Sequence, residues 1–117
     1  MIKTKSLKGR GLFKLILRKG KYEAGKYITI YTFKTKKENA DNNFLGICVS
    51  KKHGNSVLRN RIKRWAKESY TVLEKNVTSG YNIIILYKKN IEVEKLSYLI
   101  ILEELRGLLS KGNIFHE

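Results

Sequence analysis

The stretch "KKHGNSVLRNRIKRWAKES", Lys51 to Ser69, decides how the middle of the chain folds. Asn55 or Ser56 can cap a helix N-terminus just after Gly54, which suits a tight entry turn. Apolar or small residues then recur at helical spacing through this stretch and a few residues beyond it. These positions are Leu58, Ile62, Trp65, Ala66, Ser69, Val72 and Leu73. We therefore predict a helix that packs this stripe against a sheet.

The rest of the predicted helix surface is basic. Arg59, Lys63 and Lys67 follow one another at i, i+4 and i+8, and Arg64 and Arg61 continue to the opposite edge. Like charges at this spacing destabilise a free helix, whereas a solvated face gains from mixed signs. Arginine also offers a planar fork that can hold a phosphate with two hydrogen bonds. We interpret the surface as a phosphate-binding one rather than an ordinary solvated face.

Length and charge narrow the class of protein. The chain has 117 residues, with 25 Lys and Arg against 10 Asp and Glu, for a formal charge of +15. We predict a single domain spanning residues 1–117. Such an excess of charge repels itself unless a polyanion neutralises it, so nucleic acid is the leading partner and an anionic membrane surface the second. The hydrophobic content of 42% excludes a disordered basic tail.

The single cysteine and the apolar runs bear on location. With Cys48 alone, no intramolecular disulfide and no cysteine-based metal site can form, which fits a reducing compartment. The basic N-terminal segment is broken by Lys14 and lacks a small-residue cleavage site, so we do not interpret it as a secretory signal. No apolar run is longer than that from Ile83 to Tyr87, which is too short to span a bilayer. We expect a cytoplasmic protein with no membrane partner.

The other predicted elements are shorter. The pattern of Phe13, Ile16 and Leu17 predicts a helix that ends at Gly20, and apolar runs predict strands over 27–33, 44–50 and 81–87. A final core-packing helix is expected within 93–109. Tyr27, Tyr31 and Phe33 would share one face of the first strand. These aromatic rings either belong to the core or form a platform for single-stranded bases.

Candidate catalytic residues are scarce. Hydrolysis of a phosphodiester usually needs carboxylates that hold metal ions, or positioned histidines. The chain has one aspartate, Asp41, and its two histidines, His53 and His116, have no evident partner in the sequence. We interpret His53 as a phosphate contact or a turn residue. We predict no catalytic residue and leave metal sites open, so any reactive centre would lie elsewhere.

The central motif points to a family. "KKHGNSVLRNRIKR", with its arginine-asparagine-arginine core, closely resembles the signature of the bacterial ribonuclease P protein component. The resemblance covers nearly the whole chain, including "GICVSKK" before the motif and "YNIIIL" after it. It implies an α/β (α+β) two-layer sandwich of order α-β-β-β-α-β-α. That fold is similar to domain 2 of ribosomal protein S5, with a left-handed βαβ crossover that departs from the usual handedness.

The resemblance also implies partners and site residues. Family members bind a large catalytic RNA, which removes the 5′ leader of precursor tRNA through bound Mg²⁺, and we expect no obligate protein partner. The residues implied to bind RNA are Lys51, Lys52, Asn55, Arg59, Asn60, Arg61, Lys63, Arg64 and Lys67. Those implied to line the leader cleft are Phe13, Leu17, Tyr27 and Tyr31. Leu17 stands where the family commonly has an aromatic, and Lys67 where it frequently has arginine.

Two other classes of function compete with this one. A structural RNA-binding protein of the ribosomal type would share the charge and the fold without taking part in cleavage. A protein-only nuclease would cleave without an RNA subunit.

Overall fold

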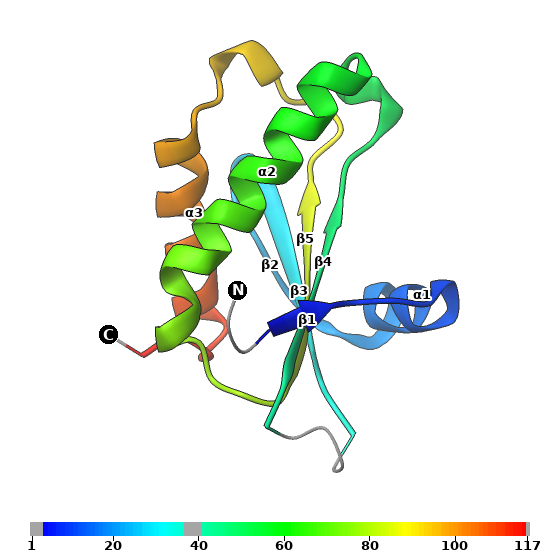
Figure 1. The fold of residues 1–117 in the computed structure, drawn as a ribbon, viewed down its shortest axis with the longest axis vertical. Helices are drawn as coiled ribbons and strands as arrows, with labels where there is room; N and C mark the ends of the chain where they lie inside the picture. Colours follow the sequence, from blue (N-terminus) through cyan, green and yellow to red (C-terminus); the bar gives the residue numbers. More distant parts are fainter. Residues whose placement is uncertain (1–3, 37–40, 117) are drawn as a thin grey trace.

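The computed structural model describes residues 4–36 and 41–116. Its main elements are β1 (Thr4–Ser6), α1 (Arg10–Lys19), β2 (Lys21–Ala24), β3 (Ile28–Lys34), β4 (Asn43–Cys48), α2 (Ser56–Leu73), β5 (Tyr81–Tyr87) and α3 (Tyr98–Lys111). From α1 onward this is the order α-β-β-β-α-β-α, with the short strand β1 added before it (Figure 1). The predicted fold class is confirmed.

The strands form one mixed sheet in the order β1-β4-β5-β3-β2. Strand β4 pairs in parallel with both β1 and β5, whereas β3 pairs antiparallel with β5 and β2. Parallel neighbours need a long crossover connection, and α2 provides it between β4 and β5. Gly46, Ile84, Tyr31 and Tyr22 lie in register across four strands, which places them on the same face of the sheet.

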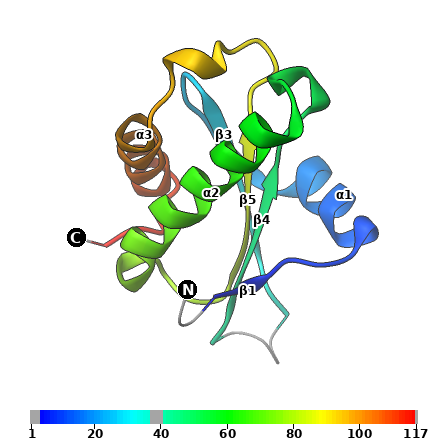
Figure 2. The ribbon, with the colours of Figure 1, turned by 45° about the horizontal axis from the view of Figure 1, so that its top comes forward.

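Helices cover the two faces of the sheet unequally. Helices α2 and α3 lie together on one side, which we call the helix-pair face, and α1 lies alone on the other, the α1 face (Figures 1 and 2). The large core on the helix-pair face includes Ile62, Ala66, Tyr70 and Leu73 from α2, Ile101, Leu105, Leu108 and Leu109 from α3, and Ile28, Ile30, Leu45, Ile83, Ile85 and Tyr87 from the sheet. On the α1 face the buried cluster comprises Leu7, Ile16 and Ile84. The sheet and the helix pair thus form the predicted two layers, and α1 adds a partial third.

Strand β5 is buried on both faces, as its continuous apolar run predicts. Ile83 and Ile85 point to the helix-pair face and Ile84 to the α1 face, and all three are fully buried. Neighbouring strands on either side satisfy its backbone. This strand is therefore the centre of the fold.

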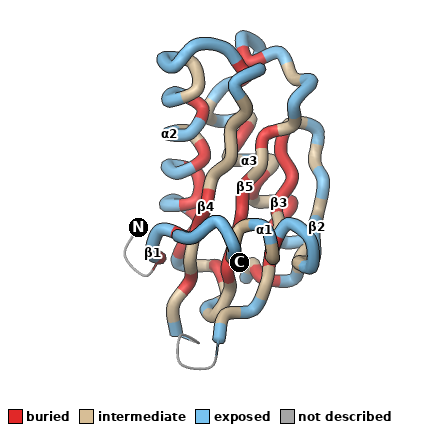
Figure 3. The backbone as a smooth tube through the Cα atoms, turned by 90° about the vertical axis from the view of Figure 1, so that its right-hand side faces the viewer, coloured by how far each residue is buried: buried red, intermediate tan, exposed pale blue. Residues whose placement is uncertain are grey.

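Helix α1 lies across the middle of its face of the sheet. Figure 3 looks onto this side, where β1 and α1 form a band in front of the strands, which continue above and below it. A Cβ at Gly46 would overlap the ring of Phe13, so a glycine here allows α1 to approach β4. The helix ends at Gly20, whose N–H donates to the Ile16 carbonyl at 2.8 Å, as predicted.

The last helix begins later than its sequence pattern predicts. A single 3-10 turn, Val93–Lys95, precedes it, and the Ser97 hydroxyl then caps α3 by accepting from the N–H of Ile100. Within α3, Glu104 anchors the turn between β2 and β3. Its carboxylate accepts from the N–H groups of Lys26 at 2.5 Å and of Tyr27 and Ile28 at 2.8 Å.

The buried stripe of α2 differs from the prediction at two positions. Val72 was expected in the stripe but is 52% exposed, whereas Tyr70 was not expected there and is fully buried. The reason is contact with two strands, because the Tyr70 hydroxyl lies 2.8 Å from the Thr4 hydroxyl of β1 and accepts from the Asn43 amide of β4 at 3.4 Å. Within the described residues, no helix combines the length and the apolarity needed to cross a membrane.

Candidate nucleic-acid interface

The entry to α2 is a tightly hydrogen-bonded turn. Lys51–His53 form a 3-10 turn, in which the Ser50 hydroxyl accepts from the N–H of Lys52 at 3.2 Å. Gly54 follows with φ of 118°, a conformation that side chains rarely allow. Asn55 then caps α2 by accepting from the N–H of Leu58 at 3.0 Å, which confirms one of the two predicted caps. The turn holds Lys51 and Lys52 exposed at the helix N-terminus.

His53 belongs to this turn rather than to the exposed surface. Its ring is buried, Nδ1 accepts from the N–H of Ser50 at 3.0 Å, and Nε2 lies 2.7 Å from the Lys88 carbonyl. A carbonyl can only accept, so Nε2 carries the proton and both ring nitrogens are occupied. Of our two interpretations, the structure supports the turn residue and contradicts the phosphate contact.

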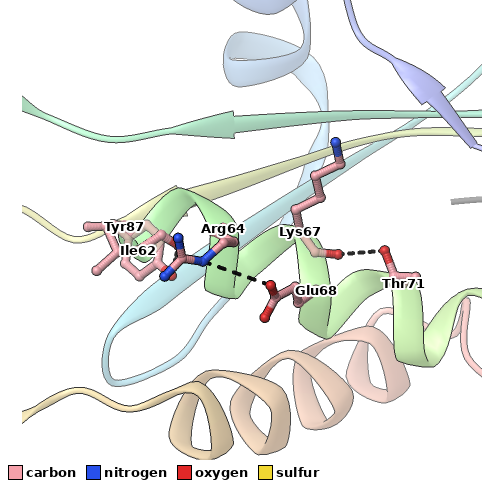
Figure 4. Close-up of polar contacts among 6 residues, drawn as sticks. All are labelled: Ile62, Arg64, Lys67, Glu68, Thr71 and Tyr87. Atoms are coloured by element: carbon pink, nitrogen blue, oxygen red, sulfur yellow. Dashed lines mark hydrogen bonds and ion pairs between the residues drawn. The ribbon is translucent and has the colours of Figure 1, made fainter. Parts of the chain in front are cut away.

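The cations of α2 are displayed to solvent. Asn60, Arg61, Lys63, Arg64 and Lys67 are exposed, and Arg59 is half-buried beside the packed stripe. One cation has an acidic neighbour, since Arg64 Nε lies 3.8 Å from Glu68 Oε1 (Figure 4). Exposed pairs of this kind contribute little stability, typically below about 1 kcal/mol. Arg64 is therefore easily recruited by a stronger anion.

Lys67 occupies a different side of α2 from that pair. Figure 4 shows its side chain extending away from α3, while Arg64 and Glu68 lie together farther round the helix. At 100° per residue, Arg59, Lys63 and Lys67 share an edge that borders the buried stripe. The helix thus presents two basic edges, as its sequence predicts.

Aromatic and apolar side chains gather around α1 on the sheet. Phe13 and Tyr31 pack against the cluster of the α1 face, and Leu17 is 39% exposed on the helix. The ring of Tyr22 lies 5.9 Å from that of Tyr31, measured between centroids, and Tyr22 is 66% exposed. Sequence reasoning missed Tyr22, because its place opposite Tyr31 depends on pairing between β2 and β3.

Tyr27 does not join this group. It packs against the larger cluster of the helix-pair face, and Lys26 Nζ lies 5.4 Å from the centroid of its ring. Our expectation that Tyr27 shares a face with Tyr31 and Phe33 is wrong. Tyr27 precedes the first residue of β3, so strand alternation does not govern it, and its N–H is held by Glu104.

The charge of the basic helix reaches the α1 face at one side chain. Cys48, at the end of β4, packs against the cluster of this face. Burial raises the pKa of its thiol, and the positive charge of Lys63 partly offsets that rise. The charge of Lys63 therefore acts at the β4 side of the α1 face, where Phe13 packs at Gly46. The molecule thus presents exposed cations on α2 and aromatic rings on the α1 face of the adjoining sheet.

This combination suits binding better than bond cleavage. Fixed cations attract phosphates, and exposed rings offer stacking surfaces to unpaired bases. Among residues 4–36 and 41–116, no group of three His, Cys, Asp or Glu side chains is placed to hold a metal ion. His116 instead lies 2.6 Å from the Thr78 hydroxyl through Nε2.

Comparison with known proteins assigns the family. Residues 1–113 match the family model described as Ribonuclease P. The ribonuclease P protein component of Clostridioides difficile is 38% identical over 85 residues, covering 72% of each chain. That of Bacillus cereus is 37% identical over 89 residues, covering 76% of each chain.

Solved structures agree with this assignment. The RNase P protein of Staphylococcus aureus superposes with a TM-score of 0.81 at 32% identity, covering 95% of this chain and 97% of that one. The RNase P protein from Thermotoga maritima gives 0.79 at 28% identity, covering 92% and 96%. The basic helix, the five-stranded sheet and these matches lead to one conclusion: the chain belongs to the ribonuclease P protein family.

Proposed function

We propose that this protein is the RNA-binding subunit of ribonuclease P, which binds the catalytic RNA and the single-stranded 5′ leader of precursor tRNA. Membership of the family supports a role in tRNA processing. The observation that carries the finer proposal is the pairing of two surfaces, the exposed cations of α2 and the rings of Tyr31 and Tyr22 on the α1 face of the adjoining sheet. A leader strand would use both surfaces at once, since its phosphates bind cations and its unpaired bases stack on aromatic rings.

The two edges of α2 suggest a division of tasks. Arg59, Lys63 and Lys67 border the sheet surface, so we assign them to the leader together with Asn60. Arg61 and Arg64 lie farther round the helix, and Lys51, Lys52 and Asn55 lie at its N-terminal end. We assign these five residues to the RNA subunit. Arginine forks suit the phosphates of a folded RNA.

The leader would lie on the α1 face beside this helix. Tyr31 and Tyr22 offer rings for stacking, and Phe13 and Leu17 offer apolar contact from α1. Tyr22 is an addition to the residues implied by the resemblance, and Tyr27 would act only by supporting the β2–β3 turn. A ring that stacks on a base typically contributes about 1 to 3 kcal/mol.

Hydrolysis is assigned to the RNA subunit. The residues at both proposed surfaces are lysines, arginines, asparagines, aromatic rings and one leucine, whereas Mg²⁺ prefers carboxylate and phosphate oxygens. We therefore assign Mg²⁺ to the RNA. This chain would position the substrate and neutralise phosphate charge. We propose that the protein acts in the cytoplasm.

Reconstitution tests the proposal directly. The purified protein is added to ribonuclease P RNA at low Mg²⁺, and cleavage of precursor tRNA is measured. We expect stimulation by the protein, and no cleavage by the protein alone. Binding of the RNA without stimulation would instead support the structural RNA-binding alternative, and cleavage without RNA would support a protein-only nuclease.

A matched pair of leucines tests the leader surface. Leu17 on α1 is 39% exposed and Leu99 on α3 is 66% exposed, so Leu17→Ala and Leu99→Ala remove the same atoms from opposite sides of the molecule. Leu17→Ala should weaken binding of precursor tRNA by the holoenzyme about threefold, as expected for loss of partly buried apolar contact. Mature tRNA should bind equally well. Equal results for the two variants would remove α1 from the leader site.

A further inference from the structure

A groove lies on the α1 face, beyond the surface assigned to the leader. It has a volume of about 770 Å³ and is bounded by β1, α1 and the ends of β3 and β4. Its lining residues are Lys5, Ser6, Leu7, Lys8, Leu12, Leu15, Phe33, Lys34, Thr35, Lys36, Phe44 and Asn82. None of the residues assigned above to RNA or to the leader is among them.

Helix α1 separates this groove from the leader surface. Ile16 is fully buried under the helix, facing Ile84. At 100° per residue, Leu12 and Leu15 lie on one flank of Ile16, and Phe13 and Leu17 lie on the other. Leu12 and Leu15 line the groove, whereas Phe13 packs at Gly46 on the far flank. The two flanks therefore serve two separate surfaces, one on each side of the band that α1 forms across the sheet (Figure 3).

The chemistry of the groove is apolar below and cationic above. Leu7 is buried, and Phe33 and Phe44 are half-buried across the strands, with Asn82 of β5 between them in register. Lys5, Lys8, Lys34 and Lys36 are exposed, and the described lining includes no acidic side chain. Four cations around an aromatic floor complement a polyanion that also carries flat apolar rings. A folded duplex would use the cations alone, because its bases are stacked inside.

We propose that this groove binds an unpaired segment of RNA other than the leader. The phosphates would lie on the lysines, and one or two bases would enter to meet Phe33 and Phe44. The proposal goes beyond leader binding and does not depend on it. An acidic polypeptide could use the same lysines, but it would gain little from an aromatic floor.

Charge reversal tests the rim. Lys5→Glu with Lys34→Glu changes the groove, and Lys75→Glu with Lys111→Glu makes the same change in net charge at exposed sites outside it. The probe is a labelled single-stranded RNA of about 12 nucleotides bound to the free full-length protein. We expect about tenfold weaker binding for the groove variant, with its salt slope reduced by about 1.4 for two lost phosphate contacts. Equal weakening in the control would overturn the proposal.

A second variant tests the aromatic residues of the groove without leaving a cavity. Phe44→Leu keeps an apolar side chain but removes the ring, so single-stranded RNA should bind about fivefold more weakly while duplex RNA is unaffected. Photo-crosslinking with 4-thiouridine should also label peptides that contain Phe33 or Phe44. Crosslinks confined to Tyr22 and Tyr31 would contradict the proposal, and so would equal losses of affinity for duplex RNA. An acidic peptide that competes with RNA and binds the Phe44→Leu variant as tightly as the wild type would also contradict it.

Precursor tRNA separates this inference from the function proposed above. With short and long leaders, the holoenzyme carrying Lys5→Glu and Lys34→Glu should discriminate leaders as the wild type does. Selective loss of long leaders would show that the groove holds the leader, contrary to the inference. Failure of the wild-type protein to stimulate cleavage would instead contradict the proposed function and leave the oligonucleotide result standing.

Discussion

The two faces of the sheet differ in how much apolar surface they bury and how much they leave exposed to solvent. On the helix-pair face, α2 and α3 bury a continuous cluster that includes Ile62, Leu105 and Ile85. On the α1 face, three buried residues support one helix of ten residues, and rings such as Tyr22 stay open to solvent. Buried apolar area is the main favourable contribution to folding. The helix-pair face therefore stabilises the fold, which allows the α1 face to remain partly uncovered.

This division explains why exposed apolar groups are tolerated on a small protein. A binding surface for unpaired bases must present rings to water, which stabilises nothing until RNA arrives. Tyr22 and Leu17 are exposed in this way. Because the opposite face holds most of the core, these residues can change with little effect on folding.

The largest expected effect tests that division directly. Leu105 on α3 is fully buried in the helix-pair cluster, so Leu105→Ala should lower the free energy of unfolding by about 3 kcal/mol. Leu17→Ala, on the other face, should lower it by about 0.5 kcal/mol or less. Urea denaturation followed by circular dichroism measures both. Similar losses for the two leucines would break the comparison.

A smaller effect is expected at the clamp between α3 and the β2–β3 turn. Glu104→Ala leaves the N–H groups of Lys26, Tyr27 and Ile28 without their acceptor and should cost about 2 kcal/mol of unfolding free energy. Glu103→Ala is the control, because this exposed neighbour accepts no backbone N–H of the turn among the described residues and pairs with Arg106 at 3.3 Å. Thermal unfolding of both variants shows whether Glu104 stabilises the β2–β3 turn or acts only as a surface charge. If they unfold alike, the turn does not depend on the helix-pair face.

A third prediction concerns the connection between the faces. Tyr70 of α2 joins Thr4 of β1 and Asn43 of β4 through its hydroxyl, so Tyr70→Phe should cost about 1 kcal/mol. Tyr22→Phe is the control, since Tyr22 is 66% exposed. Hydrogen exchange should show faster opening of β1 in the Tyr70 variant. Unchanged exchange at residues 4–6 would mean that β1 is held by its pairing with β4 alone.

Sequence patterns predicted the elements that carry long periodic runs. The apolar run of β5, the aromatic alternation of β3 and the stripe of α2 each have enough residues to determine their type. Strands β1 and β2 were not located from their residues. "TKS" and "KYEA" are short and mostly polar, and they become strands only because β4 and β3 offer them partners.

The candidate site was predictable in part for the same reason. The basic surface of α2 depends on one helix, so spacing alone located its exposed cations. Tyr22 depends on a strand pairing, and Tyr27 depends on a clamp from Glu104 that lies 77 residues away. Val72 and Tyr70 both border the apolar stripe of α2, and contacts with β4 and with the unpredicted strand β1 decide which of them is buried. The periodicity of a sequence does not predict contacts between segments that lie far apart in the chain.

A prediction of opposite sign concerns a buried hydroxyl in α2. Ser69 is fully buried on the helix-pair face, and its Oγ has no hydrogen-bond partner within the described part of the chain. Burying a hydroxyl without a partner costs stability, and alanine also favours helix. Ser69→Ala should therefore raise the free energy of unfolding by about 1 kcal/mol.

Ser110→Ala separates the two contributions to that gain. Ser110 lies exposed in α3, so its replacement by alanine changes helix propensity but removes no buried hydroxyl. This variant should gain about 0.5 kcal/mol or less in free energy of unfolding. Urea denaturation of both variants gives the difference that belongs to the buried hydroxyl. If Ser69→Ala proves less stable than the wild type, the hydroxyl has a partner, and the helix-pair face contains a polar contact that its packing alone does not indicate.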